Sequence, residues 1–283
     1  MKHIIILGDG MADHPVDRLC GKTLLQCAEA PYMNMLAKEG QCGRLITIPE
    51  GFHPGSEVAN TSILGYDLNK VYEGRGPLEA ASIGYQLQPE DMAMRCNLIT
   101  LHDGRIITHN GGNLSTHDGD MLIKMLDREL GNDQIKFVTG IQYRHLLVVR
   151  KARKHVVCAP PHDHHAEPWR PLLIQSEPGW EDVREPICGA DGKPTGELRL
   201  TGNETAELLN NLILKSQTLL EDHLYNQNKV AHHQRPANSI WPWGGGYRPM
   251  MDTLMQMYPQ IKSGSVISAV DLIRGIGHYA GLD

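Results

Sequence analysis

Residues 3–10 read HIIILGDG, and this stretch indicates the fold class of the chain. Its apolar part, 3–8, is short, continuous and rich in β-branched side chains, which is typical of a strand buried in a parallel sheet. Asp9 and Gly10 follow at the carboxyl end of that strand. Ligands of open α/β sheets gather beyond these ends, so Asp9 is a candidate metal ligand. An aspartate there can equally cap the following turn.

Both ends of the chain continue this α/β pattern. We expect helices that begin at Pro31 and end at Gly40, over 251–258 and up to Tyr279, and strands at 43–48 and 265–270. Together they predict an α/β domain that is discontinuous in sequence, formed by residues 1–73 and 235–283.

The middle of the chain, residues 74–234, reads as an inserted α+β module. We expect strands at 92–101 and 142–150, and a turn at 151–154 that forms a hairpin into 155–159. One amphipathic helix should follow Thr116 and end at Gly131, and another should open with a capping box of Thr201 and Glu204.

Composition narrows the class of protein. The 283 residues carry a formal net charge of -6, whereas a general nucleic-acid binder is normally basic. The six cysteines form no C-x-x-C pair, which favours reduced thiols in a cytoplasmic protein. No apolar run approaches the length of a membrane span or of a signal-peptide core. We therefore expect no nucleic acid and no membrane as partners, and the sequence leaves an oligomer open.

A second motif is PGSEVANTSILGYD, residues 54–67. Pro54 and Gly55 force a turn, and helix-like apolar spacing follows, so Ser56 should lie at a helix N-terminus. Such a serine is most often an N-cap. The same place suits a nucleophile, because the helix dipole and free amides stabilise a phosphate on the hydroxyl oxygen.

Eight blocks of this sequence resemble the archaeal-type, cofactor-independent phosphoglycerate mutases. They are ILGDGMAD, PGSEVAN with SILGYD, GRGPLEAAS, RCNLIT, GIQYRHLLVV, PPHDH, IWPWGGG and ISAVDLIRGIGHYAGL, and they occur in this order over nearly the whole chain. The resemblance implies an alkaline-phosphatase-like core with an inserted cap domain that binds the substrate.

The resemblance also implies a mechanism. Asp9 and Ser56 would be ligands of two divalent metal ions of manganese, zinc or magnesium type. Ser56 would take the phosphoryl group and return it to a different hydroxyl, so that no organic cofactor is required. A metal pair activates a serine oxygen and neutralises phosphate charge, and phosphoryl transfer needs little beyond positioning and charge stabilisation.

Candidates for binding the small phosphorylated substrate lie in the matching blocks of the insert. They are Arg75, Arg95, Arg144, His145, His162, Asp163 and His164. Arginine suits bidentate capture of phosphate and carboxylate, although any one of them can instead form a surface ion pair. The run HDHHAE at 162–167 could form a separate metal site. We expect the tryptophans of IWPWGGG to pack between cap and core, with its glycines in a turn between the domains.

Two departures from the family pattern affect these expectations. The mutases usually carry a histidine four residues after the serine, where this chain has Asn60, which cannot act as a charged acid or base. The PGSEVAN form looks like a bacterial subgroup proposed to be a homoserine kinase. Members also run well beyond the position of Asp283 and carry their other metal ligands there.

The second departure implies that the C-terminal part of the core is missing. We expect a fragment of a longer protein, with an intact mass above 31.5 kDa, and little activity from this chain alone. Three functions follow: interconversion of 3-phosphoglycerate and 2-phosphoglycerate in glycolysis, a homoserine kinase-like phosphotransfer, or non-catalytic binding of phosphate or metal. A kinase needs a nucleotide, but this superfamily would not use the G-x-x-x-x-G-K-[ST] loop that the sequence lacks.

Overall fold

A computed structural model describes residues 2–189 and 192–283, which belong to two compact units, Met1–Ile46 and Thr47–Asp283. The first unit contains a 3-10 helix at Asp17–Leu19 and two helices, α1 (Leu24–Cys27) and α2 (Pro31–Glu39). Helix α2 confirms the helix predicted from Pro31, which occupies the first turn as its fixed φ favours.

The strands predicted at 3–8 and 43–48 are wrong. Both segments are irregular, and none of the described residues 2–46 is buried. Ile4 and Ile6 are 84% and 87% exposed. A strand is stabilised by hydrogen bonds to a neighbouring strand, and no described residue provides such a partner here. Local β-propensity alone therefore does not form the strand.

The second unit is built on a five-stranded antiparallel sheet with β1 (Asp91–His102) at its centre. β4 (Arg144–Arg150) pairs with β1 over Asp91–Asn97, and β9 (Ser239–Gly246) pairs with it over Ala93–Ile99. The two therefore occupy opposite edges of β1. β3 (Ile135–Ile141) lies beyond β4, and β2 (Arg105–Thr108) pairs with the last residues of β1.

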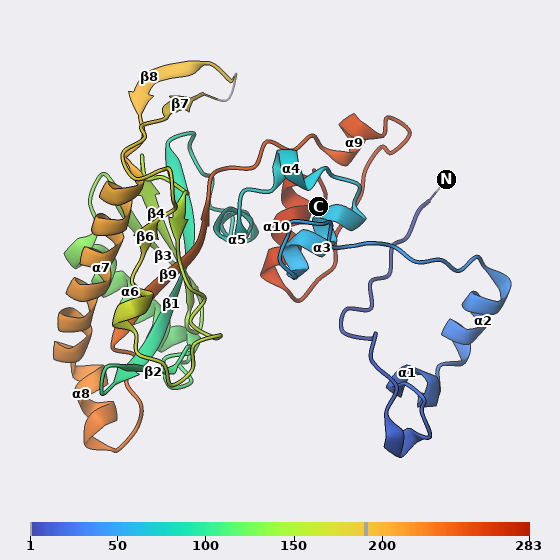
Figure 1. Cartoon of the computed structure of the whole chain (residues 1–283), viewed down its shortest axis with the longest axis horizontal. Helices are drawn as coiled ribbons and strands as arrows, with labels where there is room; N and C mark the ends of the chain where they lie inside the picture. The colour runs from blue at the N-terminus through green and yellow to red at the C-terminus, as the bar shows by residue number, and fades with distance from the viewer. Residues whose placement is uncertain (1, 190–191) are drawn as a thin grey trace. The chain divides into compact units, whose positions relative to one another are not determined.

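The two faces of this sheet are covered by different helices. On one face α6 (Thr116–Leu130) and α7 (Gly202–Asp222) form the main core with alternate β1 residues. That core includes Met92, Met94, Cys96, Leu98, Leu122, Leu126, Leu209 and Ile213. On the other face Ala80 of α5 (Arg75–Ser82) packs with Ala93. Helices α7 and α5 lie on opposite sides of the sheet in Figure 1.

The starts of the two long helices follow their sequences. Thr201 caps α7 and exchanges hydrogen bonds with Glu204, which confirms the predicted capping box. Ser115 caps α6 by accepting from the Asp118 backbone N–H, and Gly131 follows its last residue. The predicted strands at 92–101 and 142–150 are present as β1 and β4.

Short helices from both ends of the second unit pack together, and α10 (Asp271–Tyr279) packs this group against α5. The other helices of the group are α3 (Ser56–Ile63), α4 (Leu68–Val71) and α9 (Leu254–Met257). Leu78 of α5 packs against Leu272 and Ile276 of α10. Tyr66 donates its hydroxyl hydrogen bond to the Asp252 carbonyl at 2.7 Å. The helix predicted to end at Tyr279 is confirmed, and only 254–257 of the predicted helix at 251–258 is helical.

The remaining elements of the second unit are short. These elements are α8 (Leu224–Ala231), a 3-10 helix at Arg170–Leu172, and strands β5 (Val156–Val157), β6 (Gln175–Ser176), β7 (Pro186–Cys188) and β8 (Pro194–Leu198). Two predictions for irregular parts of the chain are wrong. β5 pairs with β6 instead of returning along β4, so the hairpin predicted at 151–159 is wrong. The strand predicted at 265–270 is irregular, since it pairs with no described strand.

IWPWGGG, residues 240–246, also differs from the expectation of a turn. Its backbone forms most of β9, where pairing with β1 satisfies its hydrogen bonds. Trp241 packs with Ile99, Ile106 and Trp169 inside the module. β9 follows residue 234, the predicted end of the insert, so the sheet draws on residues from both sides of that boundary.

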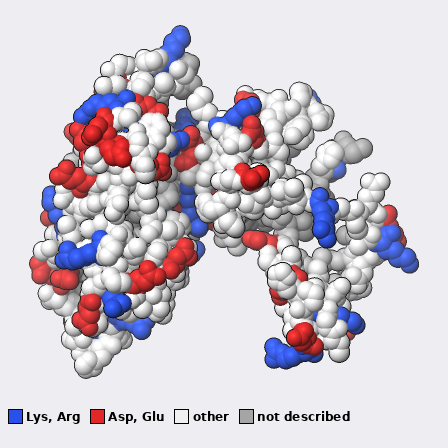
Figure 2. Space-filling view, in the orientation of Figure 1, with Lys and Arg blue, Asp and Glu red and all other residues white. Residues whose placement is uncertain are grey.

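The surface carries both signs of charge. Figure 2 shows Lys and Arg side chains interspersed with Asp and Glu on the face in view, rather than gathered in one patch of a single sign. Within the described residues, no helix is both long enough and apolar enough to cross a membrane.

Helix α7 offers a matched test of the core. Leu209 is 0% exposed and Leu214 is 40% exposed on the same helix. Leu209→Ala should lower the free energy of unfolding by about 2–5 kcal/mol, because it removes buried apolar contacts and leaves a cavity. Leu214→Ala should cost less than about 1 kcal/mol. Urea unfolding of both variants measures the difference, and equal losses would contradict the assigned burial.

Candidate active site

Ser56 is the first residue of α3. Gly55 occupies the N-cap position and no side chain caps the helix there, so Ser56 is not the N-cap of this helix. The Ser56 side chain is half-buried at a helix end, where free backbone N–H groups and the helix dipole favour an anion. Asn60 donates from its side-chain amide to the Ser56 carbonyl at 2.8 Å. Asn60 therefore stabilises the first turn of α3.

The residues around Ser56 include a buried carboxylate. Glu57 is 5% exposed, and its Oε1 lies 3.7 Å from Nε2 of His53. Burial, followed by the proximity of Glu57 and a hydrogen bond with it, raises the pKa of Tyr72. Tyr72 is therefore a neutral hydroxyl that can donate to Glu57.

A cavity of about 820 Å³ opens beside this helix end, where His53 and Glu57 line it and Ser56 does not. Its walls combine the loop before Ser56, the start of α5, the segment around β5 and the end of β9. The lining residues with polar or aromatic side chains are Phe52, His53, Glu57, Tyr72, Glu73, Arg75, Lys154, His155, Cys158, Glu177 and Trp243. This size falls within the range of ordinary small-molecule sites.

Most charges in this cavity wall have a partner. Lys154 Nζ lies 2.5 Å from Glu73 Oε2, and His155 Nδ1 lies 3.0 Å from Glu177 Oε2. Arg75 donates from Nε to Glu79 Oε1 at 2.6 Å, and Arg95 donates to the same Glu79 oxygen. One carboxylate is thus shared by two arginines.

Arg75 and Arg95 differ in exposure. The Arg75 side chain is 28% exposed and lines the cavity, whereas the Arg95 side chain is 6% exposed. Burial lowers the pKa of Arg95, and the charge of Glu79 opposes that shift. Both guanidinium groups lie over the ring of Trp243, at 5.2 Å and 5.8 Å from its centroid.

Close backbone contacts bring these groups together. Gly74 has φ 110, which favours glycine, and a Cβ there would lie 2.5 Å from the Gly245 carbonyl oxygen. A Cβ on Gly76 would lie 2.2 Å from the Ala93 carbonyl oxygen. The block GRGPLEAAS therefore lets the start of α5 pack directly on β1 and beside the end of β9, which places Arg75 next to Trp243.

Asn97 on β1 is a site residue that the sequence reasoning missed. It is 1% exposed, and its Oδ1 accepts from Arg95 Nε at 3.0 Å and from Trp243 Nε1 at 3.3 Å. Its Nδ2 donates to the His109 carbonyl at 3.1 Å. Glu79 was missed in the same way. Glu79 lies in the matching block GRGPLEAAS and Asn97 in RCNLIT. Membership of these blocks was the only feature of the sequence that could have indicated a role in the site.

His109 and His162 extend the site along the Trp243 side. Their ring centroids are 6.1 Å apart, and the His162 ring meets Trp243 edge-on at 5.3 Å. Burial, then the proximity of His162 and Arg95, lowers the pKa of His109. The sequence reasoning missed His109, whose neighbours in the chain suggest only a loop after a strand.

The other predicted substrate residues of the 162–167 run, Asp163 and His164, have partners within the run itself. The Asp163 side chain is 64% exposed and lies 3.7 Å from His162 Nε2. His164 Nδ1 lies 2.8 Å from Glu167 Oε2. Among the residues that the structure describes, no group of three or more His, Cys, Asp or Glu side chains could hold a metal ion. The alternative of a separate metal site in HDHHAE therefore gains no support.

Arg144 and His145 begin β4. Arg144 is half-buried, and its Nε has no partner among the described residues. His145 is 1% exposed, and its Nδ1 accepts from the Gly140 N–H at 3.1 Å. Burial lowers the pKa of His145 to about 3. His145 is therefore a neutral ring enclosed by the fold.

Asp9 belongs to the first unit, where it is exposed, and Ser56 to the second. These two side chains are too few to hold a metal pair, because a single catalytic zinc already takes three protein ligands.

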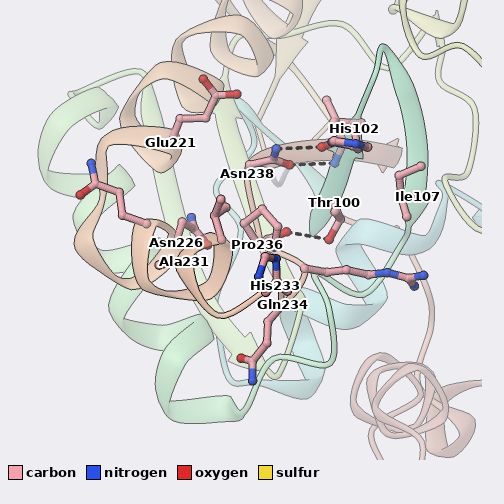
Figure 3. Close-up of a pocket in the computed structure, with 14 residues that line it drawn as sticks. Thr100, His102, Ile107, Glu221, Asn226, Ala231, His233, Gln234, Pro236 and Asn238 are labelled. Atoms are coloured by element: carbon pink, nitrogen blue, oxygen red, sulfur yellow. Dashed lines mark hydrogen bonds between the residues drawn. The ribbon is translucent and has the colours of Figure 1, made fainter.

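A second cavity, of about 930 Å³, lies at the carboxyl end of β1 (Figure 3). Several of its polar side chains are engaged with backbone groups. Asn238 bonds to both backbone groups of Leu101, and the Thr100 hydroxyl donates to the Pro236 carbonyl. It contains none of the residues predicted from the sequence, and we do not assign it to the active site.

The fold and site define a mixed α/β protein with a serine at a helix N-terminus beside a cavity lined by arginine and tryptophan. The family described as 2,3-bisphosphoglycerate-independent phosphoglycerate mutase matches residues 37–226. The chain belongs to this family. A mutase of that name from Methanosarcina barkeri is 43% identical over 284 residues, which is 100% of this chain and 64% of the relative.

A further curated relative and two solved structures are also similar to this chain. A probable mutase of the same name from Geobacter sulfurreducens is 40% identical over 287 residues, which cover 100% of this chain and 65% of that protein. A solved cofactor-independent phosphoglycerate mutase from Thermoplasma acidophilum has a TM-score of 0.54 and 26% identity, covering 97% of this chain and 66% of that one. A solved Pyrococcus horikoshii protein has a TM-score of 0.68 and 25% identity, over 97% and 58%. The chain thus spans about 64% of the length of the first curated relative.

The buried His145 predicts a pH dependence of stability. Its folded pKa of about 3 lies below the ordinary unfolded value of about 6.5, so between these values the unfolded state binds more protons. The contribution of His145 to stability is therefore present above pH ~6.5 and is lost as the pH falls toward ~3, by at most about 1.4 kcal/mol per pH unit.

His145→Asn should make the free energy of unfolding fall less steeply over this range, because asparagine keeps an acceptor for Gly140 but does not titrate. Urea unfolding between pH 4 and 7 measures the slope. The exposed His102→Asn serves as the matched control and should keep the slope of the unchanged protein. An identical slope in His145→Asn would contradict a neutral buried imidazole.

Proposed function

We propose that the protein interconverts 3-phosphoglycerate and 2-phosphoglycerate through a phosphoserine at Ser56. The observation that carries this proposal is the position of Ser56, at an uncapped helix N-terminus beside a cavity lined by Arg75, in a chain of the mutase family. A free helix N-terminus stabilises a phosphate on the serine oxygen, and Arg75 offers donors in a fork that matches phosphate or carboxylate oxygens.

The reaction proceeds in two transfers. The Ser56 oxygen attacks phosphorus, the bond from phosphorus to the 3-oxygen of glycerate breaks, and that oxygen takes up the proton that serine loses. Glycerate then reorients, its 2-hydroxyl oxygen attacks the phosphorus of the phosphoserine, the bond from phosphorus to the Ser56 oxygen breaks, and that oxygen takes up the proton that the 2-hydroxyl loses. No phosphate or electron is gained or lost, so no bisphosphorylated cofactor is needed.

The remaining sequence expectations belong to this proposal. We propose that five of the predicted residues contact the substrate: Arg75, Arg144, His162, Asp163 and His164. Arg95 and His145 are buried, and we propose that they support the residues that contact it. We also propose an alkaline-phosphatase-like core, a metal pair of which Asp9 and Ser56 are two ligands, and a cytoplasmic role in glycolysis. The family match supports the core, the metal pair and the role in glycolysis. The net charge of -6 is consistent with a small-molecule enzyme rather than a nucleic-acid binder.

Ser56→Ala should abolish turnover, with a loss on the order of 10³-fold or more, because the nucleophile is removed. The measurement is an enolase-coupled assay of the protein expressed from its intact gene, supplied with manganese and 3-phosphoglycerate. Ser62→Ala, on the same helix, is the control and should keep turnover. Mass spectrometry should find phosphate on the Ser56 peptide of the active protein only.

Absence of turnover in a protein shown to be intact and metal-loaded would contradict the mutase proposal. ATP with homoserine is then the next substrate pair, and transfer to homoserine would establish the kinase-like alternative. Phosphate binding without either reaction would favour a non-catalytic binding protein.

Arg75→Met should raise the KM for 3-phosphoglycerate roughly tenfold, because it removes a charged hydrogen-bonding group from the cavity while keeping the apolar stem. Steady-state kinetics in the same assay measure this. Arg170→Met, at an exposed arginine that lies over Trp169, is the matched control and should leave KM unchanged. An unchanged KM in Arg75→Met would place the substrate elsewhere.

A further inference from the structure

The ion-pair network of Arg75, Arg95 and Glu79 carries one more positive than negative charge, beside a cavity whose wall also includes the carboxylate of Glu57. Arg75 and Arg95 share Glu79 Oε1, so two guanidinium charges face one carboxylate. The neighbouring Lys154 has its own carboxylate, Glu73. Among the described residues, none accepts a hydrogen bond from the terminal nitrogens of Arg75. These nitrogens are the donors left for a ligand.

The buried members of this network determine that surplus. Arg95 is 5% exposed and Asn97 is 1% exposed, so neither presents much surface to the cavity. Asn97 Oδ1 accepts from Arg95 Nε and from Trp243 Nε1, which fixes the Arg95 guanidinium beside the indole. Held there, Arg95 donates to Glu79 and takes up much of its negative charge. Without Arg95, Glu79 would neutralise Arg75.

We propose that Glu79, Arg95 and Asn97 are positioning residues that set the charge and direction with which Arg75 binds an anionic oxygen group of the ligand. Glu79 holds the Nε side of the Arg75 guanidinium, so its other edge is left for the ligand. Trp243 supports both guanidinium groups over one ring. This inference rests on the proposed function only for the identity of the ligand as a phosphoglycerate.

Two nearly isosteric substitutions distinguish an effect of charge on Arg75 from a purely structural role of these residues. Asn97→Asp keeps the acceptor for Arg95 and Trp243 but adds a negative charge, which cancels the surplus. Glu79→Gln keeps an acceptor for both arginines but removes a negative charge, which doubles the surplus. Because charges interact strongly in a partly buried network, we expect inorganic phosphate to bind roughly tenfold more weakly to the first variant and severalfold more tightly to the second.

The experiment is calorimetric titration of the full chain with inorganic phosphate, at constant ionic strength in a phosphate-free buffer. Asn203→Asp and Glu207→Gln, at exposed positions of α7, are the matched charge controls and should bind phosphate as the unchanged chain does. Circular dichroism checks that each variant is folded. Should Asn97→Asp fail to fold, the tighter binding expected of Glu79→Gln still decides the proposal.

A second measurement tests whether the effect passes through Arg75. In an Arg75→Met background, Glu79→Gln and Asn97→Asp should no longer change the affinity in opposite directions, since residues that act on one another are not additive. Weaker binding in both variants of the unchanged background would indicate disruption alone and would overturn the proposal. So would effects of opposite sign that persist without Arg75.

These titrations involve no turnover, so failure of the two proposals can be distinguished. An inactive protein that shows the opposite shifts in phosphate affinity would contradict the mutase reaction and leave the charge network standing. An active protein whose phosphate affinity ignores both substitutions would retain the role of Ser56 and overturn the positioning role of Glu79, Arg95 and Asn97.

Discussion

The pairing of β1 along both of its edges is the constraint on which the second unit depends. β4 and β9 bond to overlapping parts of the same strand, although they come from segments about 50 and 145 residues further along the chain. This double pairing fixes which residues of β1 face each way. A slip of one residue would exchange the two faces, and it would move Arg95 and Asn97 from the α5 side into the core under α6 and α7.

The site is built on the α5 face because that helix can approach the sheet closely. The glycines of GRGPLEAAS remove the Cβ atoms that would hold α5 away, and the glycines at the end of β9 do the same from the other side. Backbone contact of this kind places charged side chains precisely, since little flexible side chain separates the elements. Side chains from α5, β1 and β9 are consequently held close together: Arg75, Glu79, Arg95, Asn97 and Trp243.

On the proposal above, the charge network lets an overall acidic chain present a local site for an anion. The net charge of -6 describes the whole surface, whereas binding depends on groups within a few ångströms of the ligand. Glu79 is shared, Lys154 is paired with Glu73, and His155 with Glu177. Arg75 is the accessible cation of this set whose carboxylate is divided between two partners.

Sequence reasoning located the elements whose stability is local. The helix at 116–130, the capping box at Thr201 and the helix that starts at Ser56 follow from spacing, caps and turn residues close in the chain. It failed for 3–8, 43–48 and 265–270, which have β-type composition but no strand partner among the described residues. A strand exists only when another segment bonds to it, and composition does not identify that segment.

For the active site, the sequence by itself determined the family, the candidate nucleophile Ser56 and the arginines of the matching blocks. The tertiary structure alone decided which of those arginines reaches the cavity. It also showed that Glu79 is shared, that Asn97 joins Arg95 to Trp243, and that His145 is enclosed and neutral. The physical reason is that residue chemistry is written in the sequence, whereas burial and the sharing of a charge arise only when distant strands and helices pack together.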